Sequence, residues 1–200
     1  PMIHRKRTSC RACGGTDLEM FLPLGPTPLA NSFLHSVEEF AGEASFPLDV
    51  YYCHGCSLVQ LLDVIDPEVL FRNYIYVSGT SDTIAAHYVR YAQAVVDRTR
   101  PSPEDLVVEI ASNDGSLLKC FRPHNVRTLG VEPATNIAEK ARAAGIDTVN
   151  LFFDSKTAAD IRANYGAAKA VIANNVLAHV DDTQDFLRGA RHLLDQDGLL

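Results

Sequence analysis

Four of the five cysteines form two closely spaced pairs, and this spacing predicts a metal site. Cys10 and Cys13 form the first pair, and Cys53 and Cys56 form the second. A C-x-x-C turn directs two thiolates at one ion, so two such turns supply the four soft ligands that tetrahedral Zn²⁺ prefers. A shell of four thiolates leaves no open position on the metal. The predicted zinc is therefore structural and not catalytic.

A second group of polar residues follows a hydrophobic strand that contains Glu109. The strand runs into a small polar turn and then a helix, over residues 107–116. This order places backbone N–H groups and a helix N-terminus at the carboxyl end of a strand, where open α/β sheets bind ligands. Glu132 ends the next predicted strand, where an acid accepts hydrogen bonds from two ribose hydroxyls. The two features together predict a nucleoside-containing cofactor.

The composition of the turn favours one nucleoside cofactor over another. NAD requires a run of glycines, because its pyrophosphate must approach the backbone closely. Ala111, Asn113 and Gly115 occupy the corresponding positions, so only one glycine remains. S-adenosylmethionine has no phosphate and tolerates a polar turn. We therefore favour S-adenosylmethionine over NAD.

The elements around this turn alternate between strand and helix. A helix is predicted to begin at Ser81 or Asp82, and Pro101 and Pro103 follow it as a linker. The later elements are strands over 106–111, 128–132, 148–152 and 170–174, and helices from Gly115 and over 134–144, 155–165 and 183–194. This alternation predicts a parallel sheet with helical crossovers. Residues 198–200 resemble the entrance to a further strand, so we expect the domain to be incomplete at its C-terminus.

The first third of the chain has a different pattern, with many Pro, Gly, Phe and Tyr residues and little helical periodicity. Predicted strands over 46–52 and 58–62 flank the second cysteine pair, as in the knuckle of a zinc ribbon. The predicted organisation is a zinc-binding domain over 1–65, a linker segment and helix over 66–104, and a Rossmann-like domain over 105–200.

Composition and charge exclude several classes of protein. The 200 residues are 46% hydrophobic and 22% charged, which is typical of a globular domain. No apolar run is long enough to span a membrane, and no apolar segment typical of a signal peptide follows the basic N-terminus. We therefore expect a cytoplasmic protein. A net charge of −7 argues against a nucleic-acid partner.

Several longer motifs resemble one known family, the zinc-containing S-adenosylmethionine-dependent sugar C-methyltransferases, which act on nucleotide-linked keto-deoxysugars. The chain resembles the N-terminal half of that family. Besides the cysteine pairs, the matching runs are residues 28–33 (PLANSF), 46–48 (FPL), 58–61 (LVQL), 74–81 (YIYVSGTS), 109–115 (EIASNDG), 130–133 (GVEP) and 174–180 (NNVLAHV).

The resemblance implies an α/β fold, with a small zinc-ribbon-like domain followed by a class I methyltransferase domain. It also implies C-methylation by enolate formation next to a ketone and attack on the methyl group of S-adenosylmethionine. Tyr76 and His179 are then supporting donors at the reaction centre. The general base is expected beyond residue 200, so the chain alone is expected to be inactive.

The resemblance and the sheet pattern together assign a set of cofactor-binding residues. Asp114 and Gly115 are expected at the methionine end, Glu132 at the ribose, Phe153 or Asp154 at the adenine, and Asn174 beside the sulfonium; Glu109, Ser112, Asn113 and Pro133 complete the set. The expected partner is a nucleotide-sugar substrate, and monomer and dimer both stay open. The alternatives are a class I methyltransferase with another small-molecule acceptor, and a non-catalytic zinc- and nucleoside-binding module.

Overall fold

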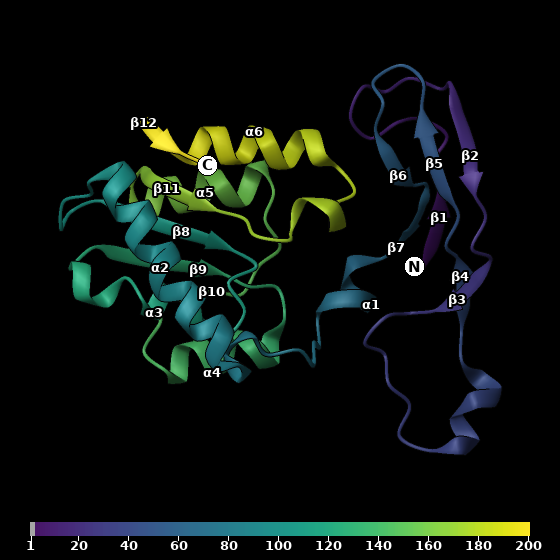
Figure 1. Cartoon of the computed structure of the whole chain (residues 1–200), viewed down its shortest axis with the longest axis horizontal. Helices are drawn as coiled ribbons and strands as arrows, with labels where there is room; N and C mark the ends of the chain where they lie inside the picture. Colours follow the sequence, from purple (N-terminus) through teal and green to yellow (C-terminus); the bar gives the residue numbers. More distant parts are fainter. Residues whose placement is uncertain (1–2) are drawn as a thin grey trace. The chain divides into compact units, whose positions relative to one another are not determined.

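The computed structural model describes residues 3–200, and the chain divides into two compact units (Figure 1). The N-terminal unit ends at Ile75, and the second unit comprises Tyr76–Leu200. Among residues 3–200, no helix combines the length and the apolar composition that a membrane crossing requires.

The N-terminal unit is built from three small antiparallel sheets. Its strands are β1 (His4–Lys6) with β7 (Asp63–Ile65), β2 (Leu18–Leu22) with β5 (Val50–Cys53) and β6 (Val59–Leu61), and β3 (Pro26–Pro28) with β4 (Ser45–Pro47). A 3₁₀ helix, η1 (Val37–Gly42), and a short helix, α1 (Pro67–Phe71), complete it.

The strand predicted over 46–52 is divided into β4 and β5 by a turn that a remote residue fixes. The backbone N–H of Leu48 donates to the carbonyl of Gly25 at 3.0 Å, and the N–H of Gly25 donates to the Asp49 carboxylate at 3.3 Å. These two bonds redirect the chain between the two sheets. The predicted strand over 58–62 corresponds to β6.

The second unit contains a five-stranded parallel sheet, as the alternating pattern predicted. The strand order is β10 (Thr148–Val149), β9 (Arg127–Val131), β8 (Leu106–Ile110), β11 (Ala168–Ile172) and β12 (Leu194–Leu199). Chain order proceeds outward from β8 in one direction and then resumes at β11 on its other side. This reversal creates a topological switch point between β8 and β11, where such sheets bind ligands.

Helices cover both faces of this sheet (Figure 1). Helices α5 (Ser155–Tyr165) and α6 (Thr183–Leu193) pack on the face that contains Val108 and Ile110. Helices α2 (Asp82–Thr99), α3 (Ser116–Lys119) and α4 (Thr135–Ala143) cover the face that contains Val107. Side chains alternate along a strand, so Glu109 points to the same face as Val107. All five residues of β8 are buried, as expected for a central parallel strand.

Several elements differ from their predicted extents; the strand predicted over 148–152, for example, is β10, which has only two residues. The helix predicted from Gly115 is α3, which has only four residues; a 3₁₀ turn, η3 (Arg122–His124), follows, because Pro123 cannot continue an α-helical ladder. The entrance predicted at 198–200 belongs to β12, which begins at Leu194, immediately after α6. Helix α5 has the bounds predicted from the sequence.

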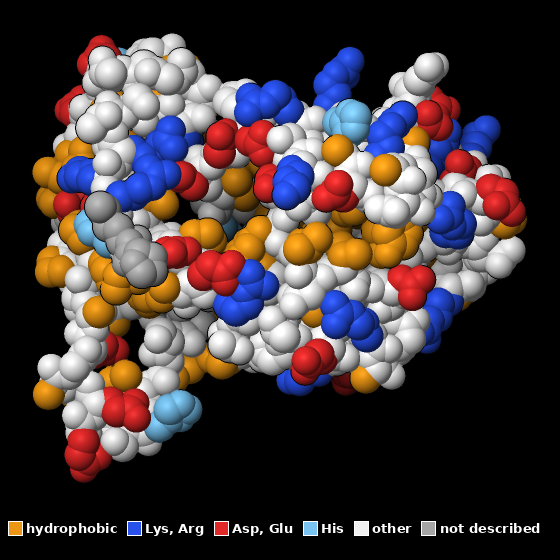
Figure 2. All heavy atoms as spheres, turned by 180° about the vertical axis from the view of Figure 1, so that it is seen from behind, with side chains coloured by type: hydrophobic (Ala, Val, Ile, Leu, Met, Phe, Trp, Pro, Cys, Tyr) orange, Lys and Arg blue, Asp and Glu red, His pale blue; other side chains and the backbone are white. Residues whose placement is uncertain are grey.

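Charges of both signs are interspersed on the surface of the second unit. Figure 2 shows Lys and Arg side chains next to Asp and Glu side chains across the visible face of this unit. This face therefore carries no continuous stripe of one sign.

Candidate functional site

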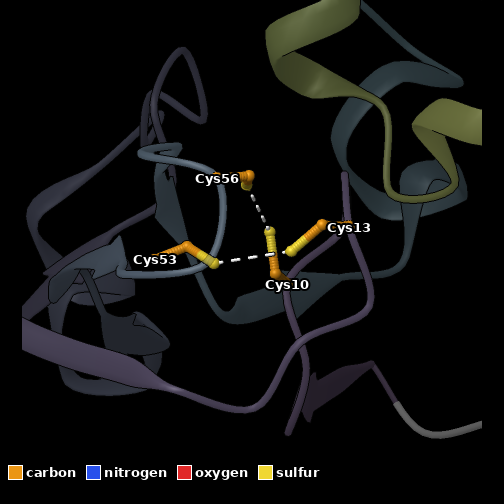
Figure 3. A group of neighbouring side chains, drawn as sticks. All are labelled: Cys10, Cys13, Cys53 and Cys56. Carbon is orange, nitrogen blue, oxygen red and sulfur yellow. Dashed lines mark hydrogen bonds between the residues drawn. The ribbon is translucent and has the colours of Figure 1, made fainter.

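The four paired cysteines converge on one point in the N-terminal unit (Figure 3). The Sγ atoms of Cys10 and Cys56 are 3.6 Å apart, as are those of Cys13 and Cys53, and all four sulfurs lie within 4.8 Å of one another. Zinc–sulfur bonds of about 2.3 Å in a tetrahedron place the sulfurs about 3.8 Å apart. The donor set therefore fits a structural Zn²⁺, as the cysteine spacing predicted.

Local backbone bonds and one buried amide shape this cluster. In the first turn, the N–H of Gly14 donates to the Cys10 carbonyl at 2.9 Å, and the N–H of Cys10 donates to the Gly15 carbonyl at 2.8 Å. The buried Gln60 amide donates to Cys10 Sγ at 3.1 Å. Burial opposes ionisation of Cys10, but this bond and nearby backbone N–H groups lower the pKa of its thiol to about 6. A thiolate is the form that binds metal.

The turn after β8 has the backbone of a glycine-rich loop but only one glycine. Ala111, Asn113 and Gly115 all adopt positive φ angles, of 52°, 51° and 73°. Asparagine tolerates this left-handed region better than most residues. Gly115 is required for a further reason, because a Cβ there would lie 2.9 Å from the Ile146 side chain.

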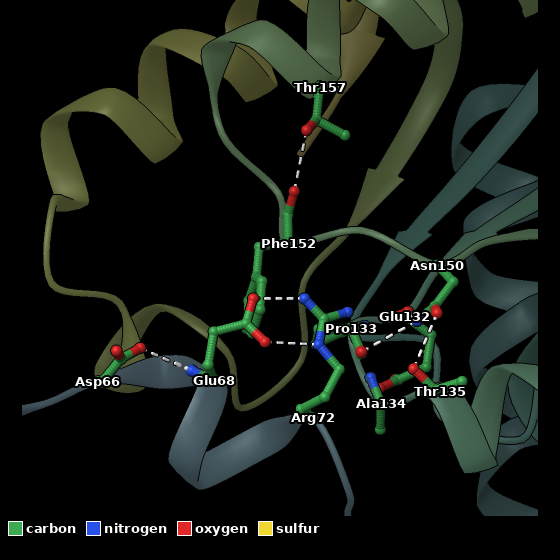
Figure 4. A network of polar contacts seen from close by, with 10 residues as sticks. All are labelled: Asp66, Glu68, Arg72, Glu132, Pro133, Ala134, Thr135, Asn150, Phe152 and Thr157. Carbon is green, nitrogen blue, oxygen red and sulfur yellow. Dashed lines mark hydrogen bonds and ion pairs between the residues drawn. The ribbon is translucent and has the colours of Figure 1, made fainter. Parts of the chain in front are cut away.

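Glu132 connects this turn to the start of α4, and Figure 4 shows Glu132 beside Ala134 and Thr135 at the start of that helix. One carboxylate oxygen accepts the Asn113 N–H at 2.8 Å, and the other accepts the Ala134 N–H at 2.8 Å. Burial raises the pKa of this carboxyl, although the two N–H bonds oppose the shift. A carboxylate has about four acceptor positions. Two remain for the ribose hydroxyls that the sequence analysis assigned to Glu132.

Asn150 supports this corner from the end of β10, and sequence reasoning missed it. Its amide N–H₂ donates to the carbonyls of Glu132 at 2.8 Å and Pro133 at 2.9 Å, and its oxygen accepts from Thr135 at 3.0 Å (Figure 4). It was missed because the strand predicted over 148–152 placed Asn150 inside the strand, whereas β10 ends at Val149.

Glu109 is a buried acid with an oxygen that lacks a partner among the described residues. The residue is 8% exposed, and its Oε2 atom makes no hydrogen bond within residues 3–200. Burial, reinforced by the charges of Asp114 and Glu132, raises the pKa of Glu109 well above its ordinary value. Three acids therefore surround the turn. This set of acidic side chains fits S-adenosylmethionine, which carries cationic groups and ribose hydroxyls.

The two predicted catalytic residues lie in segments beside the carboxyl ends of neighbouring strands. Tyr76 is 47% exposed, and its carbonyl accepts a bond from the Asn113 side chain at 3.0 Å, so its segment lies against the turn after β8. His179 ends a 3₁₀ turn, η4 (Leu177–His179), that follows β11, and it is exposed. Because β8 and β11 are adjacent and parallel, both residues belong to the carboxyl edge of the sheet.

Three other predicted cofactor residues already have structural partners. The Phe153 ring packs edge-on against Phe186 with a centroid distance of 5.2 Å, and the Asp154 carboxylate caps α5 by accepting the Thr157 N–H at 2.6 Å. Asn174 accepts a hydrogen bond from the Tyr91 hydroxyl at 3.2 Å, and both residues line a cavity of about 340 Å³. Their contacts with adenine and sulfonium stay predictions.

The remaining members of the predicted set are Ser112, Asp114 and Pro133. The Ser112 hydroxyl is buried and has no hydrogen-bond partner within residues 3–200. Asp114 accepts the Ser116 N–H at 3.2 Å at the start of α3, and the Pro133 carbonyl is held by Asn150. All three lie in the turns that follow β8 and β9.

Comparison with known proteins identifies both units. A family model described as "Putative zinc binding domain" matches residues 10–71, and one described as "Methyltransferase domain" matches residues 108–200. The chain therefore combines a methyltransferase domain with a zinc-binding domain that precedes it. The chain is a homologue of C-methyltransferase NovU from Streptomyces niveus, with 37% identity over 197 residues. The match covers 98% of this chain and 47% of NovU, so the chain spans about half the length of that relative.

Solved structures resemble part of the chain at lower identity. YcgJ from Bacillus subtilis is 17% identical with a TM-score of 0.43, over 57% of this chain and 50% of that one. DesVI from Streptomyces venezuelae is 18% identical with a TM-score of 0.42, over 57% of this chain and 48% of that one. The family resemblance found in the sequence is confirmed by the two domain matches and by NovU.

Proposed function

We propose that the protein is an S-adenosylmethionine-dependent C-methyltransferase that acts on a nucleotide-linked keto-deoxysugar. The observation that carries the proposal is the Glu132 carboxylate, held by two backbone N–H groups at the switch-point edge of the sheet. An acid in this position recognises ribose hydroxyls. The 37% identity to a C-methyltransferase over 98% of the chain supports carbon as the methylated atom.

The residues of this chain supply binding and polarisation in the proposed reaction. When bound, S-adenosylmethionine supplies an electrophilic methyl group. Loss of the proton next to the ketone leaves an enolate, whose carbon forms the new bond to methyl while the sulfonium sulfur keeps the electron pair of the broken bond. Tyr76 and His179 donate hydrogen bonds to the developing enolate oxygen or orient the sugar. The proton-abstracting base is not assigned to a residue of this chain.

The acceptor is tested with a panel of nucleotide-linked sugars, the full-length protein and isotope-labelled methyl donor. Mass spectrometry should detect one labelled methyl group on a keto sugar. The matched control is the same nucleotide sugar with its ketone reduced to an alcohol, which lacks the acidic C–H and should gain no label. Methylation of the alcohol, or of an oxygen in either sugar, would refute carbon transfer through an enolate.

A further inference from the structure

Both polar ends of the Asn113 side chain bond to a segment that precedes the sheet in the sequence. Its amide nitrogen donates to the Tyr76 carbonyl at 3.0 Å, and its amide oxygen accepts the Ser78 N–H at 2.9 Å. An amide that pairs with a C=O and an N–H two residues apart imitates a neighbouring strand. Both polar ends of the side chain face the segment of residues 76–79.

Two further contacts fix the same segment against the turn after β8. A Cβ on Gly79 would lie 2.6 Å from both Asp114 Oδ2 and Ser116 Oγ, so the Gly79 backbone is in close contact with the turn. The side chains of Ser78 and Tyr88 also hydrogen-bond, which attaches the segment to α2. The segment is therefore held from the turn and from the helix at once.

The backbone of the turn does not itself need an asparagine. Position 113 has a φ of 51°, and glycine adopts this region with less strain than asparagine. The side-chain amide of Asn113 therefore matters through its hydrogen bonds to residues 76 and 78. Because the Asn113 backbone N–H also donates to Glu132, one residue connects the predicted ribose acid to the segment that carries Tyr76.

We infer that Asn113 is a positioning residue, whose side chain holds residues 76–79 against the cofactor turn and thereby sets the Tyr76 hydroxyl at the methyl-transfer centre. The inference rests on the proposed function, and it changes the predicted role of Asn113 from direct cofactor contact to support of Tyr76. In this inference, Asn113 helps to orient the methyl acceptor and does not contribute to affinity for the methyl donor.

The decisive variant is Asn113→Gly, because it keeps the left-handed backbone and removes only the side chain. The matched control is Asn125→Gly, since Asn125 has a φ of 52° and is exposed outside the site. In the 200-residue chain, hydrogen exchange of the Ser78 amide should accelerate about 10-fold in Asn113→Gly and stay unchanged in Asn125→Gly. Affinity for S-adenosylhomocysteine should change less than about threefold in both.

In the full-length protein, Asn113→Gly should lower kcat about 10- to 100-fold while KM for the methyl donor stays nearly constant. Tyr76→Phe should lower kcat by a much smaller factor in the Asn113→Gly background than in the wild type, because both changes act through one hydroxyl. Independent, multiplying effects would overturn the inference, as would unchanged Ser78 exchange or a loss of S-adenosylhomocysteine affinity above about 10-fold. A wild-type protein that is inactive on every keto sugar would instead refute the proposed function, and the exchange measurement would still decide whether Asn113 holds the segment.

Discussion

At the scale of single residues, the Glu132 carboxylate combines an observed structural role with a predicted role in cofactor binding. Its oxygens accept N–H groups of the turn after β8 and of the start of α4, and a ribose is predicted to bind at the same carboxylate. Few substitutions can preserve both roles. This residue therefore gives the most direct test of the cofactor site.

Glu132→Ala should weaken binding of S-adenosylhomocysteine by about 2–3 kcal/mol, because two hydroxyls lose a charged acceptor. This corresponds to a Kd increase of about 30- to 150-fold, measurable by titration calorimetry. The control is Glu139→Ala, which removes an exposed acid from α4 and should leave the affinity unchanged. Unchanged affinity in Glu132→Ala would mean that the ribose binds elsewhere.

Glu109 should make stability depend on pH. Burial raises its pKa in the folded state, so the folded protein keeps a proton that the unfolded chain releases. The contribution of Glu109 to stability is then fully present below the ordinary carboxyl pKa, and it is lost as the pH rises through the raised pKa. Glu109→Gln cannot ionise and should lack this decline. Thermal melts from about pH 4 to pH 8 should show the wild-type Tm falling relative to the variant. Parallel curves would contradict the prediction.

At the scale of elements, the corner between β9 and α4 depends on an amide that comes from the next strand. Asn150 donates to two consecutive carbonyls there, so Asn150→Ala leaves part-buried acceptors without partners. We expect a loss of about 1–2 kcal/mol in the free energy of unfolding, measured with urea. Asn164→Ala also removes an amide-to-carbonyl bond, but on the exposed surface of α5, and should cost less than about 0.5 kcal/mol. Equal losses in both variants would show that Asn150 does not support the corner.

Local patterns predicted most of the elements because their causes are local. Helix α5 begins after Asp154, whose side chain caps it, and ends before Gly166, and both signals are visible in the sequence. The short extent of α3 was not predicted, because the sequence pattern indicated the start of this helix at Gly115 and no end. The division of the strand over 46–52 depends on a bond to Gly25, which no periodicity reports.

The same distinction applies to the candidate site. The cysteine pairs and the acid at the end of β9 could be identified as candidate site residues from the sequence, because each is a short pattern with one dominant chemistry. The direction of the Asn113 side chain was not readable, because its partners lie 35 and 37 residues earlier in the chain. Glu109 was identified as a cofactor residue, but its missing partner and raised pKa depend on how completely the folded sheet buries it.

At the scale of the whole molecule, the two units differ in what holds them together. Both hydrophobic core clusters belong to the second unit. In the described part of the N-terminal unit, the buried apolar side chains are Cys10, Cys53 and Leu62, so two of the three are zinc ligands in the predicted site. We therefore expect a small unit with so little buried apolar surface to depend on its metal.

Cys53→Ser should therefore release zinc and unfold the N-terminal unit, while the second unit stays folded. Elemental analysis should find less than half an equivalent of zinc, and hydrogen exchange should accelerate across residues 3–75 but not in β8, β9 and β11. Affinity for S-adenosylhomocysteine should remain within about threefold of wild type, because the cofactor edge and both core clusters lie in Tyr76–Leu200. Cys120→Ser is the matched control, since Cys120 lies outside the metal cluster and should retain both zinc and exchange protection. Full zinc content in Cys53→Ser would remove Cys53 from the ligand set. Loss of cofactor affinity together with zinc would show that the second unit needs the first in order to fold.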